Sequence, residues 1–189
     1  MSAETVGAHM PAVMTLDDLA AMAGADEHGH RYELSPEGVL SIMPPAGVEP
    51  AIIASRLFGW FLAHGWPVDQ VLQNRGLRTG TVESPGGRVP DLTVWSAVPA
   101  VGQVWAPLDG LQLAVEIVSR GSEVVDLVVK RAEYAAAGIP RYWLVNRDTG
   151  NTVTMWRLAA DKDTYQAVSQ SSRPLAWVLN TDPADYLTR

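Results

Sequence analysis

The chain has 189 residues, of which 47% are hydrophobic and 19% are charged, and this length fits one domain with its own core. A formal net charge of −7 argues against nonspecific coating of DNA, which needs a basic surface, but a nuclease with a carboxylate site remains compatible with it. The absence of cysteine excludes disulfides, zinc–thiolate sites and cysteine nucleophiles. No apolar stretch reaches the ~20 residues of a membrane span and no signal peptide is visible, so we expect a cytoplasmic protein without a membrane partner.

The N-terminal part of the sequence predicts a tail, a helix and a hairpin. Residues 1–14 are small, polar and aperiodic, which predicts a loose tail, and residues 15–189 are expected to form one domain. Thr15 is suited to cap a helix that begins at the next residue. Segments 32–34 and 39–43 predict two antiparallel strands, because the residues between them have the proline and glycine positions of a type I turn.

Two further helices are predicted. The first covers residues 51–64 and ends at Gly65, and its mostly apolar surface predicts burial against a sheet. The second covers residues 122–137 and ends at Gly138, with its charged residues on the side opposite or flanking the apolar face. That predicted apolar face consists of Val124, Val125, Val128, Val129, Ala132, Ala135 and Ala136.

The remaining apolar segments predict the strands of a mixed central sheet. The expected strands are residues 68–72, 77–79, 88–95, 113–119, 141–146, 152–158, 165–169 and 175–179, and a short helix begins at Asp182. Residues 141–146 should lie parallel to residues 113–119, because a helix connects the two through a right-handed crossover. The fold class is therefore α/β, with helices flanking the sheet and an added C-terminal β-hairpin.

Two carboxylates stand inside these apolar strands. Asp91 lies in the segment 88–95 and Glu116 in the segment 113–119, and a buried carboxylate needs a cation, a metal or a shifted pKa to persist. Lys130 follows on the next helix. Carboxylate oxygens suit Mg²⁺ or Mn²⁺, which lower the pKa of a bound water, and a lysine can orient the nucleophile or stabilise the developing negative charge. The pattern predicts a divalent-metal site.

Structural explanations for the same residues remain open. Asp91 could cap a loop or pair with Arg88, and Glu116 could belong to a salt bridge without a metal. Lys130 stands four residues after Asp126, so an ordinary helical ion pair explains it as well.

The order of these residues is similar to that of the PD-(D/E)xK nucleases, although the usual lysine position, two residues after Glu116, holds Val118. A lysine on the following helix is typical of the Uma-two family of restriction-endonuclease-like proteins, which this sequence resembles over most of its length. The matching segments are Arg31-Tyr32-Glu33-Leu34 with the Gly38 turn, Met43-Pro44-Pro45, Val89-Pro90-Asp91, Val115-Glu116-Ile117-Val118-Ser119, Asp126 with Lys130, Tyr134-Ala135-Ala136-Ala137-Gly138-Ile139-Pro140 and Tyr142-Trp143-Leu144-Val145.

The resemblance implies a restriction-endonuclease-like core and a metal-dependent nuclease acting on DNA. It carries the role of metal ligand onto Asp91 and Glu116, and the role of catalytic lysine onto Lys130. Glu33 is a further candidate ligand, with a surface or hairpin position as the alternative. Glu49 stands next to Pro50, where family members often have a His-Gln pair, and could replace that lost polar group. Asp126 is another candidate at the site.

Two other functions compete with the nuclease. The first is a catalytically degenerate member of the fold that serves as a binding or assembly module, which the departures at Val118 and Glu49 favour. The second is a metal-dependent hydrolase of a smaller phosphoester, which an acidic surface tolerates better than long DNA. A homodimer or higher homo-oligomer is a further expectation.

Overall fold

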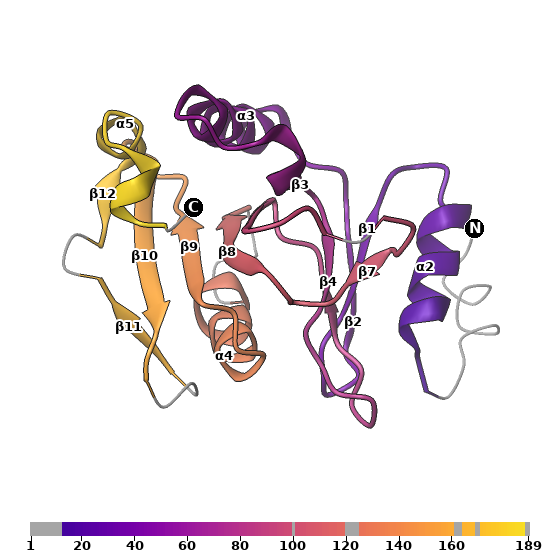
Figure 1. The fold of residues 1–189 in the computed structure, drawn as a ribbon. Coiled ribbons are helices and arrows are strands. Elements are labelled where there is room, and N and C mark those ends of the chain that lie inside the picture. The colour runs from indigo at the N-terminus through magenta and orange to yellow at the C-terminus, as the bar shows by residue number, and fades with distance from the viewer. Residues whose placement is uncertain (1–12, 100, 120–124, 161–163, 169–170, 188–189) are drawn as a thin grey trace.

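The structure is a computed structural model and describes residues 13–99, 101–119, 125–160, 164–168 and 171–187. Two β-sheets lie side by side, with helices packed against each of them (Figure 1). The smaller sheet has five strands in the order β2-β1-β5-β4-β7, and the larger has seven, in the order β11-β10-β9-β8-β6-β3 with β12 beside β10. The sequence predicts the larger, mixed sheet but not the division into two.

The smaller sheet is built around the predicted hairpin. Its strands are β1 (Arg31–Leu34), β2 (Leu40–Met43), β4 (Gly76–Arg78), β5 (Gly87–Arg88) and β7 (Trp105–Ala106). The β1–β2 hairpin is confirmed, and Gly38 closes its turn at φ +85°, which a glycine adopts without strain. Helix α2 (Leu16–Ala25) packs on this sheet and begins with the predicted Thr15 cap. Met14, predicted as part of the tail, is buried with this helix.

The larger sheet carries the main core. Its strands are β3 (Val71–Gln73), β6 (Leu92–Trp95), β8 (Leu111–Ile117), β9 (Arg141–Val145), β10 (Thr152–Leu158), β11 (Tyr165–Ala167) and β12 (Arg173–Pro174). The predicted parallel pairing of β8 with β9 is confirmed, and β10 and β11 form the expected C-terminal hairpin. The segment predicted to begin β3 instead starts with a 3₁₀ turn, η1 (Val68–Gln70).

Helices cover both faces of the larger sheet (Figure 1). Helix α3 (Val48–Ala63) buries Ile53, Leu57 and Phe61 on one face, although Ile52, also predicted to be buried, is 54% exposed. Neither α3 nor any other helix in the described part of the chain is long and apolar enough to cross a membrane.

The predicted strand at residues 175–179 is wrong. Pairing with β10 ends at Pro174, and the chain then forms helix α5 (Leu175–Val178), followed by the expected turn η3 (Pro183–Asp185) capped by Asp182. Leu175 and Val178 lie three residues apart on one helical face, and both are buried in the main core. A helix thus buries the same apolar residues that an edge strand would have left partly exposed.

The helix that carries Lys130 is turned the opposite way from the prediction. Its described part is a π-helical segment, η2 (Val125–Lys130), that continues into α4 (Arg131–Ala136); the predicted start lies outside the described residues. Lys130 is 3% exposed and Tyr134 is fully buried, whereas Val128 is 53% exposed. The charged side faces inward because oppositely charged side chains from both sheets meet it there.

Candidate active site

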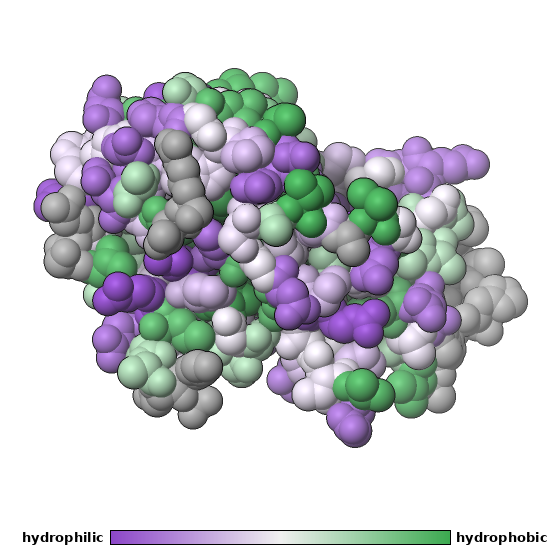
Figure 2. Space-filling model, in the orientation of Figure 1, coloured by the Kyte–Doolittle hydropathy of each residue, from purple (hydrophilic) through white to green (hydrophobic). Residues whose placement is uncertain are grey.

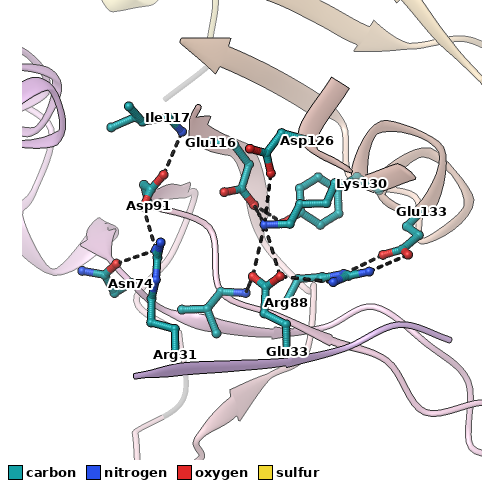
Figure 3. Close-up of polar contacts among 12 residues, drawn as sticks. Arg31, Glu33, Asn74, Arg88, Asp91, Glu116, Ile117, Asp126, Lys130 and Glu133 are labelled. Atoms are coloured by element: carbon teal, nitrogen blue, oxygen red, sulfur yellow. Dashed lines mark hydrogen bonds and ion pairs between the residues drawn. The ribbon is translucent and has the colours of Figure 1, made fainter. Parts of the chain in front are cut away.

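The candidate site lies where the two sheets and the η2–α4 helix meet (Figure 3). The chain passes from β5 in the smaller sheet to β6 in the larger one within residues 89–91, so Asp91 stands at the crossing. Strand β8 contributes Glu116, and η2 contributes Lys130. The charged residues gathered there are Arg31, Glu33, Arg88, Asp91, Glu116, Asp126, Lys130 and Glu133.

Asp91 is held by one cation and one backbone group. Its Oδ1 accepts a hydrogen bond from Arg31 Nη1 at 2.7 Å, and its Oδ2 accepts one from the Ile117 backbone N–H at 2.7 Å. The alternative partner Arg88 does not contact it, since that guanidinium binds other carboxylates. Arg31 Nε is buried without an acceptor in the described part of the chain. The guanidinium therefore binds Asp91 through Nη1 while its Nε donor stays without a partner there.

Glu116 is buried, and two donors converge on the same oxygen. Lys130 Nζ lies 3.0 Å from Oε1, and the Tyr134 hydroxyl donates to Oε1 at 2.6 Å. Burial raises the pKa of Glu116 to about 8; Lys130 opposes this shift, and the negative charge of Asp91 adds to it. This carboxyl group therefore takes up a proton more readily than an exposed glutamate does.

Lys130 is the centre of the cluster (Figure 3). Its Nζ lies 3.0 Å from Glu116, 3.2 Å from Glu33 and 3.5 Å from Asp126. The helical pair with Asp126 exists, but it is the longest of the three contacts. Burial by itself lowers the pKa of Lys130, yet the carboxylates outweigh burial and raise it, so the ammonium stays charged.

Arg88 ties the smaller sheet to the helix. Its Nε and Nη2 donate to the two oxygens of Glu133 at 2.6 Å each, and Nη1 donates to Glu33 at 3.1 Å. Glu33 is 1% exposed, so its interpretation as a surface residue is wrong. Burial raises the pKa of Glu33, but Lys130 and Arg88 outweigh burial and lower it. Glu33 is thus an ionised, structurally paired member of the cluster.

The cluster contains more negative than positive charge. Five carboxylates (Glu33, Asp91, Glu116, Asp126 and Glu133) meet three cations (Arg31, Arg88 and Lys130), so the formal balance is −2 when all are ionised. All five carboxylate residues are buried. Excess buried charge is costly, and it can be relieved by a proton on Glu116 or by a bound cation.

A cleft of about 630 Å³ opens onto this cluster. Asp91, Asp126 and Lys130 line it, whereas Glu116 is not among the lining residues. Glu49 lies at the same cleft, where it accepts a hydrogen bond from Arg147 Nε at 2.8 Å, and its side chain is 54% exposed. Glu49 is thus a partly solvated ion-pair residue, and it does not join the buried cluster.

The residues fit a hard dication by donor chemistry and charge, because oxygen ligands suit Mg²⁺ and Mn²⁺ and the cluster lacks two positive charges. In their present positions Asp91 contacts Arg31, and Glu116 contacts Lys130, which it shares with Glu33 and Asp126. Among the described residues no three His, Asp or Glu side chains converge as a metal-binding group. The magnesium or manganese site therefore stays a prediction.

The sequence predicts a site with Asp91, Glu116, Lys130, Glu33 and Asp126, and the structure places these residues in one cluster. The sequence does not predict the contributions of Arg31, Glu133 and Tyr134. The strand pattern could have indicated that Arg31 lies at the site, because residues 31 and 33 of one strand point to the same face and Glu33 is a candidate ligand. The inward position of Glu133 and Tyr134 had no such signal, since it depends on how the helix is rotated.

Comparison with known families identifies the chain. The family model Uma2, described as "Putative restriction endonuclease", matches residues 16–183. The chain belongs to the Uma2 family. This Uma2 protein also resembles the solved structure of "a putative nuclease belonging to DUF820 from Anabaena variabilis ATCC 29413", with a TM-score of 0.59 and 16% identity over 91% of this chain and 96% of that one. No curated protein matches the sequence significantly. The α/β, restriction-endonuclease-like fold class is confirmed.

Proposed function

We propose that this Uma2 protein is a metal-dependent nuclease that hydrolyses phosphodiester bonds in DNA, with Mg²⁺ or Mn²⁺ held by Asp91 and Glu116. The observation that supports this most is the formal balance of −2 in a buried cluster beside a cleft of about 630 Å³. A dication neutralises that excess, and the membership in a family described as restriction endonucleases points to phosphodiesters as the substrate.

The residues at the site would have separate roles in hydrolysis. The dication, when bound, lowers the pKa of a coordinated water and offsets charge on the phosphate. Lys130 and Tyr134 hold Glu116 in one orientation, and the Ile117 N–H does the same for Asp91. Arg31 lines the cleft with its side chain 22% exposed, so it can exchange Asp91 for a phosphate oxygen of the substrate. Lys130 stays protonated and offsets negative charge beside the cleft.

Cleavage assays test the proposal. The purified chain is incubated with supercoiled plasmid and with single-stranded DNA, with Mn²⁺ or with EDTA, and products are separated on gels. Cleavage should need the metal and should disappear in Asp91→Asn, whereas Arg56→Gln, on the exposed side of α3, should cleave normally. Metal-independent activity, or activity that survives in Asp91→Asn, would remove this assignment.

A catalytically degenerate binding or assembly module is the second candidate. The observation in its favour is that Arg31 and Lys130 already pair with Asp91 and Glu116. Titration calorimetry separates the two functions: a nuclease should bind Mn²⁺ in the native chain and lose that binding in Glu116→Gln. A degenerate site should show no heat of Mn²⁺ binding in either protein.

The expectation of a homodimer also stays a proposal, as does the cytoplasm as its location. Apolar side chains lie on the outer side of α3, at the top of Figure 2, where Val48 is 78% and Ile52 is 54% exposed. Val125 and Val128 on η2 are 39% and 53% exposed. A second copy of the chain would cover apolar surface of this kind.

A further inference from the structure

A second cleft, of about 780 Å³, lies on the other face of the larger sheet. Trp143 and Met155 line it and belong to the core beneath α3, whereas Glu116 faces Tyr134 on the side of α4. Side chains from β9, β10 and β11 form its floor, and residues of α5 and η3 form its wall. This cleft is therefore separate from the carboxylate cluster.

A row of hydrogen-bond donors crosses the floor of this cleft. Arg157 pairs directly with Arg141 on β9 and with Gln166 on β11, so the three side chains stand side by side on adjacent strands. Residues directly opposite in antiparallel strands have Cβ atoms about 4.5–5.5 Å apart. Like charges at that separation destabilise a sheet unless something neutralises them.

Neither arginine forms an ion pair with another residue in the part of the chain that the structure describes. Although Asp185 also lines the cleft, it lies beyond ion-pair distance of both Arg141 and Arg157. Partial burial and the nearby Arg157 lower the pKa of Arg141. By contrast, Arg31 and Arg88 each contact a carboxylate at 2.7 Å or less. The row thus has the charge and geometry to receive an anion from outside the chain.

We propose that Arg141, Arg157 and Gln166 bind a phosphate group of a nucleotide unit, supplied by a free nucleotide or by a nucleic-acid strand. Guanidinium groups bind phosphate oxygens through paired hydrogen bonds, and an amide donor completes the row. Trp177, 38% exposed, and Tyr186 line the same cleft; Arg173 lies over the ring of Trp177 and Tyr186 packs against Trp143, so a base would stack on the remaining surface of these rings. A cleft of about 780 Å³ falls within the range of sites for ligands of this size.

Binding measurements on the full chain test this site. Tryptophan fluorescence and calorimetry in EDTA, which removes divalent ions from the carboxylate cluster, follow the addition of inorganic phosphate, adenosine monophosphate or a single-stranded oligonucleotide. Binding of the mononucleotide alone identifies a free nucleotide as the ligand, and tighter, salt-dependent binding of the oligonucleotide identifies a strand. No saturable binding of any of the three probes overturns the proposal.

Variants assign the binding to the row. Arg157→Gln and Arg141→Gln should each weaken binding about tenfold or more, because each removes a charged donor to phosphate. Arg157→Lys should retain part of the affinity, and Arg56→Gln should retain all of it. Circular dichroism checks that each variant is folded. Equal affinity in the native chain and in folded Arg157→Gln would refute the role of the row, as would an equal loss in Arg56→Gln. Neither result bears on the nuclease proposal, because metal is absent throughout.

Discussion

Replacing Lys130 by methionine removes the cation on which three buried carboxylates converge. Nζ lies 3.0 Å from Glu116 and 3.2 Å from Glu33, and the side chain is 4% exposed. Methionine fills a similar volume without charge, so the formal balance of the cluster falls from −2 to −3. Breaking a buried ion pair by removing one partner costs about 3–5 kcal/mol, a large part of the roughly 5–15 kcal/mol that stabilises a domain.

Urea unfolding followed by tryptophan fluorescence at pH 7 in EDTA measures this loss. With a slope of about 2 kcal/mol per molar urea, the midpoint of Lys130→Met should fall by roughly 1.5–2.5 M. Arg56→Met is the matched control, because it removes an exposed helical cation and should change stability by less than about 0.5 kcal/mol. Mn²⁺ should stabilise Lys130→Met more than the native chain, because a dication replaces the missing charge.

If Lys130→Met unfolds at the same urea concentration as the native chain, the lysine does not neutralise the cluster. The negative excess of the cluster would then no longer favour a bound metal ion. If the variant is destabilised as expected but Mn²⁺ changes nothing in either protein, the cluster is a structural ion-pair network and the degenerate-module function is favoured.

Three further predictions concern pH, metal affinity and assembly. The pKa of Glu116 is raised from 4.5 to about 8, so the stabilisation of the folded state by protonated Glu116 is full below pH 4.5 and is lost as the pH rises through 8. In EDTA the free energy of unfolding of the native chain should therefore fall by up to about 1.4 kcal/mol per pH unit in this window. Urea unfolding of Glu116→Gln should lack that fall. Arg31→Met should bind Mn²⁺ more tightly in calorimetry, because it frees Asp91 Oδ1 and removes a competing cation; weaker binding would mean that Arg31 holds Asp91 in its ligand position. Val128→Asp should halve the mass measured by sedimentation without loss of helical signal, and a native chain that is monomeric at micromolar concentration would contradict the homodimer prediction.

Local sequence signals were sufficient for much of the fold. The Thr15 cap, the turn at Gly38 and the helix end at Gly138 each depend on a few neighbouring residues, and the structure has all three. Residues 175–178 show the limit of such signals, because a four-residue apolar segment fits a strand or a helix equally well. There the choice followed from which side chains could reach the main core.

The sequence alone also predicted that Asp91, Glu116 and Lys130 lie together, because two acids in apolar segments require a neutralising partner; in the structure Asp91 stands between β5 and β6, so the predicted strand 88–95 is interrupted there. Only the tertiary structure decided which partner each acid received. Arg31 stands 60 positions before Asp91, and no local pattern specifies a pairing over that distance. The same holds for the helix that carries Lys130: its valines suit a core, yet the buried charges of two sheets attract its polar side. Without Lys130 and Glu133 facing inward, the carboxylates and the guanidinium of the two sheets would be buried unpaired, which is costly, and that requirement exists only once the sheets have been brought together.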